Sequence, residues 1–190
     1  MNPLDRKSIL ADKRLFFLEQ LTEKVNLESF SCPIDEYNEY LRNEAVRSQK
    51  DQMALTWLFC ERSSGAIASY MSLIADAIKL SASEKELHVL DYPFKTVPAM
   101  KIAKLAVSAS FQERYKGIGS LMVEMATEIG IARIEQYFAC RFITVDVDIG
   151  HNDTVIVFYF KNGFIYNDEA GKKLLVCVGL LAVYNLIGNA

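Results

Sequence analysis

The sequence predicts a single domain that mixes α-helices and β-strands, and three observations lead to this prediction. The chain has 190 residues, of which 51% are hydrophobic and 24% charged. This composition suits one globular core and not a disordered or fibrous chain. Residues 53–74 have the pattern of an antiparallel hairpin. Residues 99–132 have the pattern of a strand, a glycine-containing loop and a helix in succession.

The elements before the glycine loop follow from local signals. Residues 14–21 (RLFFLEQL) are expected to form a first strand. A helix should begin near Pro33, because proline suits the first helical turn and the acidic pair at 35–36 complements the helix dipole. Large apolar side chains alternate with smaller ones from Met53 onward, Ser64-Gly65 marks a turn, and residues 66–74 resume an extended pattern. The stretch 80–98 shows no clear periodicity.

The glycine loop is the first candidate functional motif. A strand is expected over 99–108, the loop follows at 114–120 (RYKGIGS), and the next segment has apolar residues at helical spacing. Such a loop presents free backbone N–H groups and the positive end of a helix dipole, which suits a pyrophosphate. The alternative is a tight turn with no ligand. It is not a Walker loop, because Ser120 follows Gly119 where that motif requires lysine.

Two later segments are expected, one clear and one ambiguous. Residues 142–148 (FITVDVD) alternate strictly, which predicts a strand with Thr144, Asp146 and Asp148 on its polar face. Residues 154–160 (TVIVFYF) favour a strand by propensity, whereas the potential helix caps on either side favour a helix. Both interpretations remain open.

The apolar tail at 174–187 is predicted to be a buried terminal strand or a subunit contact through which the chain forms a homodimer. Its 14 residues are fewer than the ~20 that a membrane-spanning helix requires. No membrane partner is therefore expected. The start of the chain carries charge where an export signal would be apolar, which predicts a cytoplasmic protein.

Charge and cysteine usage exclude some functions. The net charge is −3 and the isoelectric point is about 5.5, so no overall basic field points to nucleic acid or membrane. The four cysteines never form a CxxC pair and the chain has two histidines. We therefore expect reduced, buried thiols and no metal site.

The segment from Lys101 to Phe164 resembles the acetyl-CoA-binding unit of the GCN5-related N-acetyltransferases, the GNAT superfamily. LAV at 105–107 resembles the family's splayed fourth strand, and Arg114-x-x-Gly117-x-Gly119 resembles its R/Q-x-x-G-x-G/A loop. Asn152 and Tyr159 resemble its asparagine and tyrosine pair, and FYFKNGF at 158–164 resembles its FYEKxGF helix end. The resemblance implies an α/β fold with a bent, mostly antiparallel mixed sheet flanked by helices. One N-acetyltransferase domain would span residues 1–190, with a cofactor-binding core at about 99–166.

The resemblance also implies roles for individual residues, with acetyl-CoA as co-substrate. A backbone N–H near Val107 would bind the thioester carbonyl, and Tyr159 would protonate the departing thiolate. Tyrosine suits this step because its ordinary pKa, about 10, exceeds that of a thiol, about 8.5. Asp146 or Asp148 would accept the amine proton through water, or both are merely solvated; Ser108 is a further candidate. The expected cofactor-binding residues are Ala106, Val107, Arg114, Lys116, Gly117, Ile118, Gly119, Ser120, Asn152 and Phe158.

Three functions stay open at this point. The first is transfer of an acetyl group to a primary amine by direct attack. The second follows from a narrower likeness of residues 30–45 and 97–107 to the GNAT toxins that acetylate aminoacyl-tRNA, which implies tRNA and an antitoxin as partners. Its phosphate contacts would come from the densest basic segment, Lys95 to Lys116, although the acidic total opposes this function. The third is a non-catalytic, acyl-CoA-binding regulatory module.

Overall fold

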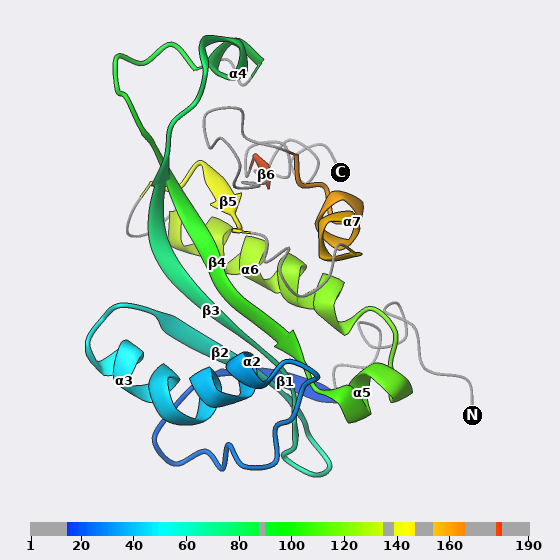
Figure 1. Ribbon diagram of the computed structural model, residues 1–190. Helices are drawn as coiled ribbons and strands as arrows, with labels where there is room; N and C mark the ends of the chain where they lie inside the picture. Colours follow the sequence, from blue (N-terminus) through cyan, green and yellow to red (C-terminus); the bar gives the residue numbers. More distant parts are fainter. Residues whose placement is uncertain (1–14, 88–89, 135–138, 147–153, 166–177, 180–190) are drawn as a thin grey trace. The chain divides into compact units, whose positions relative to one another are not determined.

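The computed structural model describes residues 15–87, 90–134, 139–146, 154–165 and 178–179 (Figure 1). The chain divides into two compact units. The first comprises residues 1–74 and 103–125, and the second comprises residues 75–102 and 126–190. The prediction of a single domain for the whole chain is based on the chain length and on the family resemblance, and it stays a prediction.

The described strands form one six-stranded sheet in the order β1-β2-β3-β4-β5-β6. Within the described residues, β1 pairs antiparallel with β2, β2 with β3 and β5 with β6, and β4 pairs parallel with β5. The mixed, mostly antiparallel sheet expected from the sequence is therefore confirmed. The strands are β1 (Phe16–Gln20), β2 (Leu55–Glu61), β3 (Ile67–Ile78), β4 (Val97–Val107), β5 (Phe142–Thr144) and β6 (Val178–Gly179).

Helices lie between successive strands along the chain, except between β2 and β3, which form a hairpin. Between β1 and β2, three short helical segments succeed one another without a break, the second of them a π-helix, and Figure 1 shows them as the cyan and blue coil. The helices are α2 (Asp35–Glu39), η1 (Tyr40–Glu44, the π-helix), α3 (Ala45–Lys50), α4 (Ala82–Leu87), α5 (Ala109–Arg114), α6 (Ile118–Ile134) and α7 (Thr154–Lys161).

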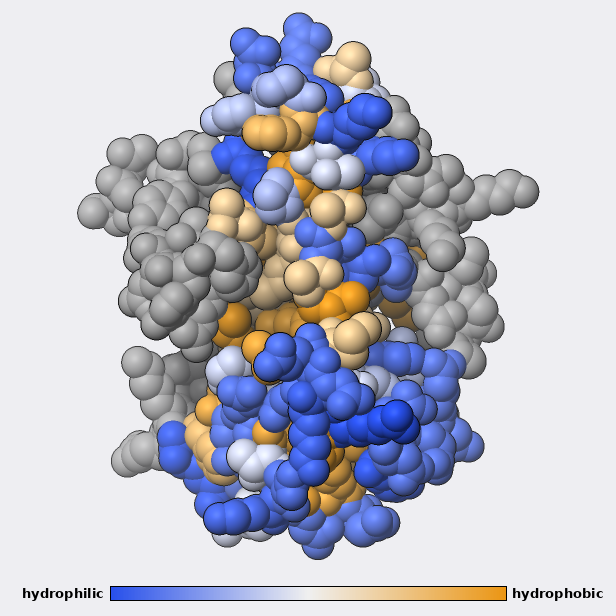
Figure 2. All heavy atoms as spheres, turned by 90° about the vertical axis from the view of Figure 1, so that its left-hand side faces the viewer, coloured by the Kyte–Doolittle hydropathy of each residue, from blue (hydrophilic) through white to orange (hydrophobic). Residues whose placement is uncertain are grey.

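The helical segment of the first unit begins at Asp35, two residues later than Pro33 predicts. The buried side chain of Asn38 explains this start, because its amide accepts the Cys32 N–H at 2.8 Å and donates to the Cys32 carbonyl at 2.9 Å. Leu41 is fully buried in the core of the unit, and Ile34 and Tyr37 pack against that core. Figure 2 shows a mainly hydrophilic outer surface where α3 and the neighbouring turns lie, which is the amphipathic arrangement expected of a surface helix.

The second unit has its own apolar cluster, made of Ile78, Leu80, Ala99 and Phe142. Beside it lies α4, a helix that the sequence analysis missed in the aperiodic stretch 80–98. Its signal is a capping box: the Glu84 N–H donates to Ser81 Oγ at 3.2 Å, and the Ser81 N–H donates to the Glu84 carboxylate at 2.8 Å.

The ambiguous segment at 154–160 is helical, despite its β-branched composition, and its C-terminal end has the predicted cap. Gly163 has φ +83°, in the left-handed region where glycine is favoured. The Phe164 N–H donates to the Tyr159 carbonyl at 3.2 Å and the Gly163 N–H donates to the Phe160 carbonyl at 3.0 Å. These bonds satisfy carbonyls at the end of α7 and stop the helix where the sequence predicts.

Three cysteines, Cys32, Cys60 and Cys140, are free and buried, as expected; Cys177 lies outside the described residues. Burial, with the nearby Glu19 carboxylate, raises the pKa of the Cys60 thiol to about 12. Such a thiol is unreactive near neutral pH and serves as a small apolar side chain. Among the residues that the structure describes, no helix is long and apolar enough to cross a membrane.

Candidate active site

The end of β4 carries the first predicted cofactor contacts. Ala106 is buried and Val107 is half-buried. The two residues after β4 have engaged backbone donors: the Ser108 N–H donates to the Ala68 carbonyl and the Ala109 N–H donates to the Ser31 carbonyl, both at 2.9 Å. A hydrogen bond to a thioester carbonyl at this point would therefore have to come from Val107 and not from its two successors.

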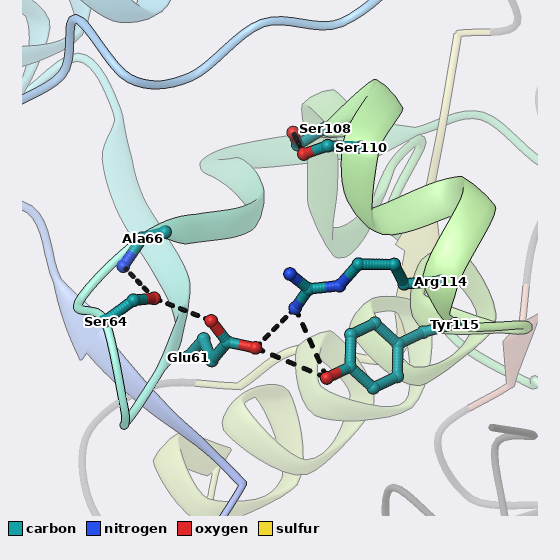
Figure 3. Close-up of polar contacts among 7 residues, drawn as sticks. All are labelled: Glu61, Ser64, Ala66, Ser108, Ser110, Arg114 and Tyr115. Carbon is teal, nitrogen blue, oxygen red and sulfur yellow. Dashed lines mark hydrogen bonds and ion pairs between the residues drawn. The ribbon is translucent and has the colours of Figure 1, made fainter. Parts of the chain in front are cut away.

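Between β4 and the glycine loop lies α5, a helix that sequence reasoning did not predict. The available signal was Ser108, a residue type that favours helix N-caps, ahead of ASFQER. Ser108 is 4% exposed and its hydroxyl lies 3.2 Å from Ser110 Oγ (Figure 3). A buried serine paired only with another hydroxyl has no strong base to activate it.

The glycine loop has the backbone geometry expected of it. Gly117 has φ +85°, which a residue with a side chain rarely adopts. The Leu121 N–H donates to the Gly117 carbonyl at 3.0 Å, so the first turn of α6 closes directly on the loop. Ile118 is buried, Gly119 and Ser120 are half-buried in that first turn, and Lys116 is exposed. A 17-residue helix thus begins at a tight turn, the arrangement that suits an anion.

Arg114, also expected to bind the cofactor, is paired with a carboxylate. Its guanidinium contacts Glu61 in both a hydrogen bond and an ion pair, and Tyr115 Oη donates to the same carboxylate at 3.3 Å (Figure 3). Burial would raise the pKa of Glu61. Hydrogen bonds from Ser64, Arg114 and Tyr115 and the charge of Arg114 outweigh burial and lower that pKa. Glu61 is therefore ionised at neutral pH.

In the second unit, the described part of β5 pairs with β4 in parallel register. Phe142, Ile143 and Thr144 lie opposite Ala99, Met100 and Lys101. The splay of the fourth and fifth strands that the family resemblance implies stays a prediction.

Asp146, a predicted general base, is tied to a lysine at this point. Its carboxylate accepts from Lys101 Nζ at 2.9 Å, and Lys101 Nζ lies 3.5 Å from Asp76. Thr144, expected on a polar face, is fully buried and donates to Asp76 at 2.7 Å. Burial would lower the pKa of Lys101, but the hydrogen bonds and charges of Asp146 and Asp76 outweigh it and raise that pKa. Lys101 stays protonated at neutral pH.

Tyr159 lies near the end of α7 and is 6% exposed. Its ring meets those of Phe158 and Phe164 edge-on, with centroids 4.9 and 5.2 Å apart. The aromatic environment matches the cluster that FYFKNGF suggested, and it fixes the ring through packing. Asp148 and Asn152 lie outside the described residues. The glycine loop belongs to the first unit, whereas Tyr159 and Asp146 belong to the second.

The basic segment from Lys95 to Lys116 is largely neutralised in the structure. Lys101 pairs with two aspartates, Arg114 pairs with Glu61, and Lys104 pairs with Glu36 at 2.5 Å. Lys104 also lies over the ring of Tyr37, 4.8 Å from its centroid. Within the described ranges, no group of three or more histidine, cysteine or acidic side chains is placed to hold a metal ion.

Comparison with known proteins gives a consistent result at the level of fold. No family model matches the sequence and no curated protein matches it. Among solved structures, AtaT complexed with acetyl-methionyl-tRNAfMet is similar with a TM-score of 0.78 at 18% identity, over 90% of this chain and 99% of that one. A mutant of KacT has a TM-score of 0.76 at 15% identity, over 90% and 99%. AtaTR bound with AcCoA has a TM-score of 0.72 at 19% identity, over 91% and 98%. Because the likeness spans nearly the whole chain at high TM-score, the chain has the GNAT-like α/β fold that its sequence predicts, in the form shared with AtaT and KacT.

Proposed function

We propose that this protein is an acetyl-CoA-dependent N-acetyltransferase and that its acceptor is the amino group of an aminoacyl-tRNA. The observation that carries the proposal is the likeness over 90% of the chain to AtaT in complex with acetyl-methionyl-tRNAfMet. The similar structure of AtaTR bound with AcCoA supports the choice of co-substrate. The shared fold is consistent with both, and the residues below supply the reasons specific to this chain.

The residues present fit acetyl-CoA. The turn at Gly117 and the first turn of α6 offer backbone N–H groups and a dipole to a pyrophosphate, with Ile118, Gly119 and Ser120 as the expected contacts. Exposed Lys116 adds a positive charge beside them. Acetyl-CoA supplies the activated thioester, and Ala106, Val107, Asn152 and Phe158 remain proposed contacts for the rest of the cofactor.

The proposed reaction is a direct transfer. The amine nitrogen forms a bond to the thioester carbonyl carbon, the carbon–sulfur bond breaks, and the thiolate takes a proton from the Tyr159 hydroxyl. An ammonium group first loses one proton to give the neutral amine, which loses a second proton to a base as the amide forms; a proton from solvent then restores the Tyr159 hydroxyl. Asp146 and Asp148 are the proposed bases; the contact of Asp146 with Lys101 engages one of its oxygens and leaves the other to accept.

The tRNA acceptor is favoured over a small amine by the structural likeness and not by surface charge. Three of the five basic residues between Lys95 and Lys116 are paired with acidic side chains, so contacts to the tRNA backbone would need other lysines or arginines. An antitoxin is a further proposed partner, because a mutant AtaT toxin was solved with the C-terminus of the antitoxin AtaR.

The deciding experiment supplies labelled acetyl-CoA with three acceptor sets: aminoacyl-tRNAs, free amino acids, and a panel of amines and peptides. Label in N-acetyl-aminoacyl-tRNA alone is expected. If only small amines are labelled, the acceptor is a small amine and not an aminoacyl-tRNA. Acetyl-CoA binding without transfer to any set would favour the non-catalytic regulatory module.

A further inference from the structure

We propose that Glu61 is a positioning residue for the glycine loop, and that Arg114 anchors this loop to β2 instead of binding the pyrophosphate. The inference rests on the proposed function, because it takes acetyl-CoA as the ligand of the loop. The sequence motif alone leads to the opposite assignment, in which Arg114 is a phosphate ligand.

Glu61 and Arg114 each end a secondary-structure element. Glu61 is the last residue of β2 and Arg114 is the last residue of α5. One Glu61 oxygen accepts from Arg114 Nη2 and from Tyr115 Oη, and the other accepts from Ser64 Oγ at 2.6 Å (Figure 3). The Glu61 side chain is 14% exposed. Both carboxylate oxygens are thus engaged, and the group is held in one position.

Aromatic rings restrain the guanidinium further. Arg114 Cζ lies 4.5 Å from the Phe111 ring centroid and 5.1 Å from that of Tyr115. Phe111 is buried and stacks on Tyr115, and the Phe16 ring of β1 meets both edge-on. Ion pairing, hydrogen bonding and cation–π contact therefore act together on one side chain. An arginine held ready for an exposed phosphate would not need these three restraints.

The anchor lies immediately before the loop. Only Lys116 and Gly117 separate the Arg114–Tyr115 pair from the first turn of α6. The Tyr115 N–H also donates to the Phe111 carbonyl at 2.8 Å, which joins the loop to α5. Because so few residues intervene, the position of the Glu61 carboxylate determines where the loop N–H groups stand relative to α6.

The two assignments of Arg114 predict opposite changes in acetyl-CoA affinity for the Glu61→Gln variant. If Arg114 binds phosphate, the Glu61 carboxylate competes for its guanidinium, and Glu61→Gln should strengthen acetyl-CoA binding. If Arg114 is an anchor, Glu61→Gln loosens the loop and should weaken binding.

The test measures acetyl-CoA affinity by titration calorimetry at two salt concentrations for the parent, Glu61→Gln, Arg114→Gln and the double variant. We expect each single change to weaken acetyl-CoA binding by about two- to fivefold. This is the ratio of dissociation constants that corresponds to the free energy of a partly exposed ion pair. The double variant should bind acetyl-CoA at least as tightly as the single variant with the lower affinity, because both changes remove the same contact. The salt dependence of acetyl-CoA binding in these variants should match that of the parent. Lys116→Gln is the matched control. Because Lys116 is exposed and proposed to contact phosphate, its neutralisation should reduce the salt dependence of acetyl-CoA binding.

Tighter binding by Glu61→Gln, a smaller salt dependence in Arg114→Gln, or unchanged affinity in both would each overturn the proposal. If Arg114→Gln does not fold, Arg114→Lys takes its place, because it keeps the charge without the guanidinium geometry. A parent protein that binds no acetyl-CoA would contradict the proposed function and not the anchor. In that case hydrogen exchange of the amides at 115–118 tests the anchor directly: exchange as slow in Glu61→Gln as in the parent would refute it.

Discussion

Tyr159 is the residue on which the proposed chemistry depends most. It is held between Phe158 and Phe164 and is 6% exposed. Packing of this kind fixes a ring whether its hydroxyl is catalytic or structural, so geometry alone supports both roles. Kinetics separates them, because a general acid acts only as the leaving group departs.

Tyr159→Phe should lower kcat by about 10²–10⁴-fold, the usual contribution of a general acid, and leave acetyl-CoA affinity nearly unchanged. Thiol release gives kcat and calorimetry gives the affinity. The control is Tyr92→Phe, the same substitution at a site that is 64% exposed. Equal kcat in Tyr159→Phe and the parent would remove Tyr159 from the mechanism.

Glu61 makes a prediction on stability as a function of pH. Its pKa is lowered from the ordinary 4.5, so the network stabilises the fold above that value and loses this contribution as pH falls through the lowered pKa. Glu61→Gln should lower the free energy of unfolding at pH 7 by about 1 kcal/mol or less, because the Arg114 partner is half-exposed. The difference from the parent should shrink as the pH falls below the lowered pKa of Glu61, because both chains are then neutral at this position. Chemical unfolding at pH 7 and along an acidic series measures the difference; a pH-independent difference would contradict the ionic origin.

At the scale of elements, the end of α7 shows how one glycine sets a helix boundary. Gly163 has φ +83° and nothing lies within 4 Å of where its Cβ would be, so a substitution is strained in the backbone and not by contact. Gly163→Ala should destabilise the protein by about 1–2 kcal/mol, and Gly163→Asn by less, because asparagine tolerates this conformation. Urea unfolding of the three chains gives the values. Alanine and asparagine variants of equal stability would show that the strain is relieved elsewhere.

The start of α6 carries the prediction for cofactor binding. Acetyl-CoA should raise the melting temperature, because a ligand that binds the native state alone stabilises it by mass action. Gly119 is in helical conformation, so Gly119→Val should leave the unliganded protein folded while its side chain blocks the approach of a pyrophosphate to the backbone. Thermal scans with and without acetyl-CoA check this. An undiminished shift in the variant would reject the loop as the binding site.

For the molecule as a whole, the C-terminal tail is the part whose removal should matter most. Its described residues, Val178 and Gly179, form β6 and pair antiparallel with Ile143 and Phe142 of β5. The tail therefore contributes a two-residue strand to the sheet, and the predicted buried strand or subunit contact over 174–187 stays a prediction. The rest of it lies outside the described residues, and homodimerisation through it stays a prediction.

Deletion of residues 174–190 should give insoluble or unfolded protein. Phe142 and Ile143 are fully buried, and loss of β6 would leave β5 as an unpaired, apolar sheet edge. The soluble yield and the sedimentation of the truncated chain measure the effect. A soluble and fully active truncation would show that the tail is dispensable.

The sequence alone determined the features that depend on neighbouring residues. The hairpin at 53–74, the strand before the loop, the glycine turn and the helix after it follow from periodicity and glycine placement, and the structure has each of them, with the helix starting inside the predicted loop at Ile118. The mixed, mostly antiparallel sheet also follows from the order of these elements and the family resemblance. Such signals extend over a few residues, so they can be recognised without knowledge of the tertiary structure.

Only the tertiary structure decided which charged side chains meet. Arg114 lies 53 residues from Glu61, and Lys101 lies 45 from Asp146, so no local pattern links either pair. Strand pairing and packing bring them together. Arg114, a predicted phosphate ligand, pairs with a carboxylate, and Asp146, a predicted base, pairs with a lysine, while both predicted roles stay predictions. The helical state of 154–160 could not be decided from propensity, because β-branched residues occur in both kinds of element; the cap at Gly163 and the contacts of Tyr159 with Phe158 and Phe164 are local features that accompany the helix. Sequence-local forces thus set the elements, whereas contacts between distant segments set the chemistry of the site.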